Sequence, residues 1–207
     1  MPFFPNLFFP IILLILTGCV SPKYRCDQMA SSDCSRAKAI WQKAIDLIVS
    51  ANFPNEYGKY RGVIWQDSFD NAWVTKGREV NITQQFLFKL TSQQILCVAA
   101  HELAHLKMGH YYAKMGIIII TPENPVLPQK SKGSHGHYGA QSNIHIPEGF
   151  GRNQEKEADR LALEYIKSVG LNRYSYIGLL NLLIDDRSNT GSPMMERIRS
   201  ILVLGAF

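Results

Sequence analysis

Residues 95–105 read Ile-Leu-Cys-Val-Ala-Ala-His-Glu-Leu-Ala-His, an apolar run that leads directly into two histidines. The run predicts a buried helix, and four residues on a helix complete slightly more than one turn. His101 and His105 would therefore point from one face toward a shared ion, for which zinc is the expected metal. Glu102 would lie beside that ion, where it can serve as the general base that activates a water molecule.

The beginning of this helix is marked by Thr91 and Gln94. We expect the Thr91 hydroxyl to cap the helix and the Gln94 side chain to reach back to the Thr91 backbone. The helix is then expected to cover residues 91–114 and to give the two histidines a rigid support. Cys97, one turn before His101, is interpreted as a small buried apolar residue, because a fourth protein ligand would close the position that catalysis needs open.

A second motif offers the third ligand. Residues 153–159 read Asn-Gln-Glu-Lys-Glu-Ala-Asp and begin an amphipathic helix that we expect to extend to residue 169. Glu155 and Asp159 share one face of that helix, so Glu155 is the expected third ligand and Asp159 the expected hydrogen-bond acceptor for a ligand histidine. Glu157 points away from both and is expected to face solvent. The alternative is that these acids only complement the helix dipole.

Together the two motifs resemble those of gluzincin metallopeptidases of the HtpX and CAAX-prenyl protease type, in which H-E-x-x-H is followed by E-x-x-A-D. Three residues match the second pattern in register: Glu155, Ala158 and Asp159. The resemblance covers residues 35–204 and implies a zinc-dependent peptidase that acts on protein or peptide substrates. It also implies that paired strands at 71–74 and 80–83 bind the substrate backbone along an exposed edge, with Asn71 and Ala72 as candidate contacts.

The C-terminal segment departs from that family in one respect. Its members commonly carry a His-Pro dipeptide shortly before an Arg-Ile, whereas this chain has Ser192-Pro193 before Arg197-Ile198. Ser192 is therefore a candidate oxyanion donor that cannot carry positive charge, and a simple cap for the last helix is an equal alternative. Arg197 matches the family's arginine and is a candidate contact to substrate, with a solvated helix arginine as the alternative.

The N-terminus indicates where the chain resides. Residues 7–16 are apolar apart from one proline and are too short to span a membrane, and Leu16-Thr17-Gly18-Cys19 resembles the end of a bacterial lipoprotein signal. We expect residues 1–18 to be a signal peptide, Cys19 to carry the lipid, and residues 19–34 to form a linker. The expected location is the periplasmic side of the cell envelope, at the outer membrane because no aspartate follows the cysteine. An uncleaved hydrophobic anchor is the alternative.

Cysteines and charge limit the compartment and the partners. Cys26 and Cys34 lie close together on either side of a turn of small residues, so a disulfide between them is expected in an oxidising periplasm. The net charge of +5 is carried by scattered basic residues, with no Arg/Lys run and no interleaving with aromatic residues. Nucleic-acid binding therefore has little support, and the membrane is reached through Cys19.

The mature chain is long enough for one domain with a single core. Its apolar patterning predicts helices at 35–51, 91–114, 153–169, 173–187 and 193–204, and strands at 63–65, 72–75 and 79–83. We therefore expect an α+β fold, a single zincin-like domain at residues 35–207 that is mainly helical, with a small sheet packed on the active-site helix. Between the metal motifs, residues 117–120 are expected to form a buried strand and residues 121–151 a long surface loop.

Four histidines lie outside the H-E-x-x-H motif. His110 falls off the ligand face and is expected to pack or form hydrogen bonds at the helix end. The other three, which belong to the long loop, are either solvated or able to hold the enzyme latent by binding its metal: His135, His137 and His145.

Three functions are compatible with these features. The first is a zinc endopeptidase that cleaves unfolded or misassembled envelope proteins, with Glu102 as its base. The second is a slow or non-catalytic chaperone-like assembly factor that keeps the metal site, which Ser192 in place of histidine favours. The third is a lipoprotein whose metal only stabilises the fold, which the presence of Glu102 argues against.

Overall fold

The computed structural model describes residues 24–28, 31–75, 77–114, 150–184 and 193–204. Its elements follow in the order β1 (Tyr24–Arg25), η1 (Cys26–Gln28), α1 (Ser32–Asn52), η2 (Pro54–Glu56), β2 (Arg61–Gln66), β3 (Ala72–Thr75), β4 (Glu79–Thr83), α2 (Gln84–Lys89), α3 (Ser92–Lys107), α4 (His110–Lys114), α5 (Arg152–Ser168), α6 (Arg173–Leu182) and α7 (Pro193–Val203). The predictions for the signal peptide, Cys19, residues 117–120, the loop histidines and Ser192 lie outside the described residues.

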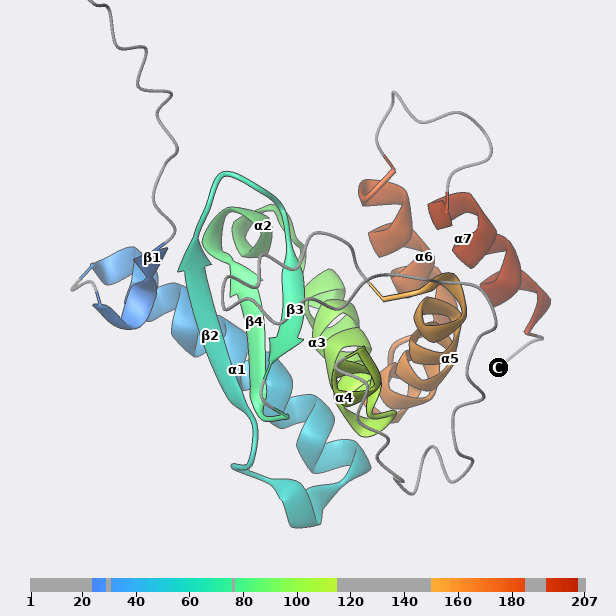
Figure 1. Cartoon of the computed structure of the whole chain (residues 1–207), viewed down its shortest axis with the longest axis horizontal. Helices are drawn as coiled ribbons and strands as arrows, with labels where there is room; N and C mark the ends of the chain where they lie inside the picture. The colour runs from blue at the N-terminus through green and yellow to red at the C-terminus, as the bar shows by residue number, and fades with distance from the viewer. Residues whose placement is uncertain (1–23, 29–30, 76, 115–149, 185–192, 205–207) are drawn as a thin grey trace, which may run out of the picture.

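The strands form one mixed sheet in the order β1-β2-β4-β3. β4 pairs in parallel with β2 and antiparallel with β3, while β1 pairs antiparallel with β2. Figure 1 shows α1 crossing one side of the sheet and α3 lying between the sheet and α5, while α6 packs on α3 and α7 packs on α5 and α6. The expected α+β class is confirmed, because the chain forms one mainly helical domain with a small sheet against α3.

α3 occupies the middle of the domain, where it packs against α1, α5, α6 and the sheet. Its buried residues include five that are fully shielded from solvent: Cys97, Ala99, Ala100, Leu103 and Ala104. Most of these side chains are small, so neighbouring helices can approach closely. The predicted capping box is confirmed, since Thr91 Oγ1 accepts from the Gln94 N–H at 3.3 Å and Gln94 Oε1 accepts from the Thr91 N–H at 2.9 Å. Burial also raises the pKa of Cys97 to about 12.

Two predicted helices end early, and one helix was not predicted. The helix predicted over 91–114 ends at Lys107, because Gly109 adopts a left-handed backbone with φ of 72° and α4 begins immediately after it. α2 follows β4 directly and was not predicted, because it has only 6 residues. α6 ends at Leu182, earlier than the predicted residue 187.

β3 is an edge strand of the sheet, whereas β4 lies inside it. Of the two strands expected to form an edge, only β3 has a side without a partner strand among the described residues. Asn81 on β4 is buried and joins the strands on either side: its Nδ2 donates to the Trp73 carbonyl at 3.1 Å, and its Oδ1 accepts from Trp65 Nε1 at 2.8 Å. Of these two strands, only β3 can therefore pair with a peptide along a free side.

The N-terminal part of the described chain is joined covalently to α1. Cys26 and Cys34 form a disulfide with their Cα atoms 5.3 Å apart, which links η1 to the first turn of α1. Among the described residues, we find no helix with the length and apolar character needed to cross a membrane.

α1 packs on β2 at Gly62, where the two elements come closer than a side chain would allow. The Gly62 N–H donates to Gln42 Oε1 at 2.8 Å, and Trp41 Nε1 donates to the Val80 carbonyl at 2.8 Å. A Cβ atom at Gly62 would lie 2.8 Å from Trp41 Cδ1 and 3.2 Å from Ile45 Cδ1. Trp41 and Ile45 are fully buried, so neither ring nor methyl group has room to yield.

Gly62→Ala should lower the free energy of unfolding by about 1–3 kcal/mol, because it overpacks this contact. Denaturant unfolding followed by circular dichroism measures the change. Gly178→Ala is the matched control: a Cβ there would meet nothing within 4 Å, and alanine favours the helix by about 0.5–1 kcal/mol. Equal stability changes in the two variants would contradict the interpretation that the contact at Gly62 has no room for a Cβ atom.

Candidate metal centre

The packing of α3 against α5 brings the three expected ligands together. His101 Nε2 lies 3.0 Å from His105 Nε2 and 3.3 Å from Glu155 Oε2, and His105 Nε2 lies 3.7 Å from Glu155 Oε1. A tetrahedral ion with bonds of about 2.0–2.1 Å holds its ligand atoms roughly 3.3 Å apart. The three side chains therefore fit a single metal ion held by two imidazoles and one carboxylate.

The orientation of His101 is fixed by Tyr176 and Asp159. His101 Nδ1 lies 2.8 Å from Tyr176 Oη and 3.2 Å from Asp159 Oδ1, and the Tyr176 hydroxyl donates to Asp159 Oδ1 at 2.7 Å. A hydrogen on Nδ1 is satisfied by these oxygens, which leaves Nε2 free to bind a metal. The position of Asp159 agrees with its expected role. Tyr176 was not foreseen, because no spacing in the sequence links α6 to the metal motifs.

Arg197 on α7 holds both acids of α5 that face the site. Its Nε donates to Asp159 Oδ2 at 2.7 Å, its Nη2 donates to Asp159 Oδ1, and its Nη1 lies 3.0 Å from Glu155 Oε2. Burial would raise the pKa of Asp159, but the hydrogen bonds from His101 and Arg197 outweigh it and hold the pKa well below its usual range. Arg197, which the sequence offered as a substrate contact, thus orients the expected ligand Glu155. It also orients Asp159, the acid that supports the expected ligand His101.

Glu102 is buried next to the ligand histidines, with an exposed fraction of 6%. Within the described part of the chain, its Oε2 atom has no hydrogen-bond partner. Burial raises the pKa of Glu102 to about 7, despite the opposing charge of His101. A buried carboxylate oxygen without a partner is costly, and its presence beside a metal-binding cluster suits a group that must exchange a proton near neutral pH.

His110 and Glu157 extend the network on the side of His105. His110 Nδ1 lies 2.9 Å from His105 Nδ1, and Glu157 Oε2 lies 3.2 Å from His110 Nε2. The prediction that His110 packs or forms hydrogen bonds at the helix end is confirmed. The prediction for Glu157 is right only in part, because its side chain is 54% exposed and also contacts His110.

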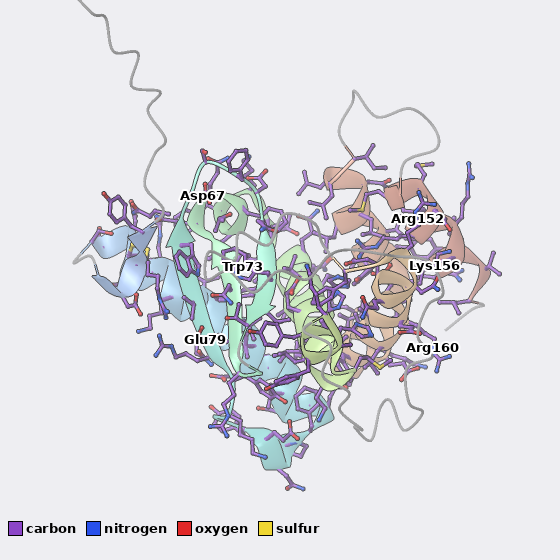
Figure 2. All side chains as sticks on the ribbon, in the orientation of Figure 1. Asp67, Trp73, Glu79, Arg152, Lys156 and Arg160 are labelled. Carbon is purple, nitrogen blue, oxygen red and sulfur yellow. A yellow bond between two sulfur atoms is a disulfide. The ribbon has the colours of Figure 1, made fainter. Side chains whose placement is uncertain are left out.

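A cavity of about 300 Å³ opens beside Glu155 and Arg197. Phe150 and Met194 give it an apolar wall, and the remaining lining residues are charged: Arg152, Glu155, Lys156, Glu196 and Arg197. Figure 2 shows Arg152, Lys156 and Arg160 following one another along the outer side of α5. Arg152 and Lys156 pair with Glu196 of α7 and line the cavity together with Glu155, so basic groups lie at the rim of the cavity next to one of the expected ligands.

The two residues expected to contact substrate on the sheet lie at the beginning of β3. The Asn71 N–H donates to Thr83 Oγ1 at 3.3 Å, and the Asn71 carbonyl accepts from the Thr83 N–H at 2.9 Å. Asn71 is exposed and Ala72 is half-buried. They belong to the open edge of the sheet and not to the cluster of metal-binding side chains.

A helix that carries H-E-x-x-H, a glutamate from a second helix that could share a metal ion with the two histidines, and a buried carboxylate beside them are typical of a metallopeptidase. Residues 35–203 match the family model described as peptidase family M48, and the chain belongs to this metal-dependent family. It is similar to the metalloprotease YcaL of Escherichia coli (strain K12), with 24% identity over 150 residues that cover 67% of this chain and 59% of that protein. The chain thus spans about 59% of the length of this curated relative.

Arg197→Leu should lower the free energy of unfolding by about 3–5 kcal/mol, because it leaves the Asp159 carboxylate buried without its ionic partner. Urea denaturation in the presence of a metal chelator measures this loss separately from metal binding. As a control, Arg160→Gln removes an exposed pair, in which Arg160 Nε lies 4.0 Å from Glu164 Oε1, and should cost less than about 1 kcal/mol. A loss in Arg197→Leu no larger than in the control would show that the pair is not buried as described.

Proposed function

We propose that this protein is a zinc-dependent endopeptidase of the bacterial cell envelope that cleaves unfolded or misassembled proteins. The observation that carries the proposal is the cluster of His101, His105 and Glu155 beside the carboxylate of Glu102, whose Oε2 has no hydrogen-bond partner among the described residues. Two imidazoles and one glutamate are the protein ligands of catalytic zinc sites that leave a fourth position open. The match to peptidase family M48 and the similarity to a protein named as a metalloprotease support the same activity.

The catalytic role falls on Glu102. When bound, zinc would polarise the scissile carbonyl and make the attacking water more acidic. Glu102 Oε2 accepts the proton that the water loses as its oxygen bonds to the carbonyl carbon. The same carboxyl group then donates this proton to the departing amine nitrogen as the carbon–nitrogen bond breaks.

The remaining site residues keep this arrangement in place. Tyr176 and Asp159 hold the ring of His101, while Arg197 holds Asp159 and Glu155. None of these groups needs to move during the reaction, because each is already hydrogen-bonded in the position that it would use. Such preorganised polar groups act in catalysis without a cost for reorientation.

Substrate binding is assigned to the open edge of β3 and to the cavity beside Glu155. β3 packs next to α3, so an extended peptide paired with β3 would run past the H-E-x-x-H helix. The cavity has room for a side chain, and its wall of Phe150 and Met194 favours an apolar one. Unfolded proteins provide such extended segments with accessible apolar side chains.

Glu102→Gln should reduce the hydrolysis of an unfolded protein such as casein by at least about 10²–10⁴-fold, because it removes the general base. Zinc content should stay at the wild-type level, since Glu102 is not a ligand. Glu164→Gln is the matched control, an identical change at an exposed position of α5, and should keep full activity. Full complementation of a deletion phenotype by Glu102→Gln would refute the peptidase and favour the chaperone-like assembly factor.

We also propose that lipidated Cys19 anchors the protein to the outer membrane. The support is the apolar stretch at residues 7–16, the Leu16-Thr17-Gly18-Cys19 sequence that follows it, and the disulfide between Cys26 and Cys34, which suits an oxidising compartment.

Cys19→Ser should leave an unprocessed precursor and abolish lipid labelling, because the modified residue is lost. Mass spectrometry of membrane fractions gives the N-terminal residue and its modification. Cys97→Ala, which changes a cysteine inside α3, should be processed like the wild type. An intact Met1 on the wild-type protein would sink the proposed anchor.

A further inference from the structure

We propose that His110 is a positioning residue for the metal ligand His105 and that it acts through a chain of hydrogen bonds ending at Glu157. The inference rests on the proposed function in so far as His105 binds the metal. His105 and His110 are both buried, with exposed fractions of 1% and 3%. His105 directs Nε2 toward Glu155 and His101, and it directs Nδ1 toward His110.

The hydrogen atoms in this series of hydrogen bonds, from His105 through His110 to Glu157, can be placed in only one way. A neutral imidazole has one N–H, so when His105 Nε2 binds a metal its hydrogen is on Nδ1. That N–H donates to His110 Nδ1, 2.9 Å away, which must then be the acceptor. The hydrogen of His110 is therefore on Nε2, where it donates to Glu157 Oε2 at 3.2 Å. The carboxylate at the end of the chain selects the tautomer of both rings.

The same construction supports the other ligand histidine. His101 Nδ1 lies next to Tyr176 and Asp159, so the series of hydrogen bonds that begins at His101 also ends on a carboxylate of α5. α5 therefore provides one ligand, Glu155, and the terminal acceptor of each chain, Asp159 for His101 and Glu157 for His105.

Backbone geometry and packing both place His110 for this task. Gly109, with φ of 72°, ends α3 and allows the chain to turn back, so that His110 lies beside the ring of His105 instead of one turn further along the helix. Phe150 stacks on the His105 ring, with centroids 3.9 Å apart and planes at 20°. The ring of His105 is thus held in its plane by Phe150 and fixed in rotation by His110.

The proposal is tested with three variants of His110 that keep one or neither of its two hydrogen bonds. Asparagine places an amide oxygen near the position of Nδ1 and can still accept from His105, whereas glutamine reaches the position of Nε2 and contacts only Glu157. Leucine removes both contacts while filling the space. Zinc affinity is measured by competition with a chromogenic chelator, and the orientation of the ligands is followed through the visible absorption spectrum of the Co²⁺-substituted protein.

We expect His110→Leu and His110→Gln to bind zinc about 10–100-fold more weakly than the wild type, as is typical when the partner of a metal-binding histidine is lost. His110→Asn should stay within a few-fold of the wild type and keep its Co²⁺ spectrum. Glu157→Ala should weaken zinc binding, whereas Glu164→Ala, an exposed acid on the same helix, should not. Equal zinc affinity in asparagine and glutamine variants would overturn the proposal.

Melting temperatures of the metal-free variants separate positioning from a purely structural role. His110→Asn and His110→Gln should melt at similar temperatures without metal and differ only with zinc bound. A loss of zinc affinity that merely follows the loss of metal-free stability would also refute the proposal. A wild-type protein that binds zinc but cleaves no peptide contradicts the proposed function and leaves the role of His110 standing.

Discussion

The contact between α3 and α5 removes His105, Asp159 and Glu102 from water, and this burial is the constraint on which the rest of the site depends. A polar group that loses water must find a partner inside the protein, or it destabilises the fold by about 1–3 kcal/mol. Tyr176, Arg197 and His110 provide those partners, from α6, α7 and α4. Three further helices thus provide partners around one helix pair. Among the described residues, Oε2 of Glu102 has no hydrogen-bond partner, and the proposed chemistry uses this oxygen.

α5 illustrates how one short segment can serve several partners. Glu155 and Asp159 lie one turn apart and face α3 and α7, while Glu157 lies on another side and meets α4. Arg197 of α7 pairs with both Glu155 and Asp159, so one guanidinium offsets the charges of the two acids that face the metal-binding cluster. Two basic residues of the same helix, Arg152 and Lys156 (Figure 2), pair instead with Glu196 of α7.

Local patterns allowed much of the fold and the ligand set to be predicted from the sequence. The period of the helix placed His101 and His105 on one face, the offset of four joined Glu155 to Asp159, and Thr91 with Gln94 marked where α3 begins. Contacts between distant segments could not be predicted in this way. Tyr176 is 75 positions from His101, and Glu157 is 47 positions from His110, and no periodicity connects them.

Other misses came from backbone geometry and from strand order. The apolar pattern continues past Lys107, yet a single left-handed glycine at 109 ends the helix and determines where His110 lies. The patterns of β3 and β4 are alike, and only the parallel pairing of β4 with β2 decides which strand remains open.

That open edge has a consequence for how a peptidase of this kind would choose among proteins. Pairing with β3 uses backbone N–H and C=O groups, which every residue except proline has in full, so the edge carries almost no information about amino-acid identity. It does distinguish conformations, since a native protein keeps its strands paired or covered and a misfolded one does not. Selection at β3 would thus depend on the folding state of a neighbouring protein, and one short strand could bind segments of many different sequences.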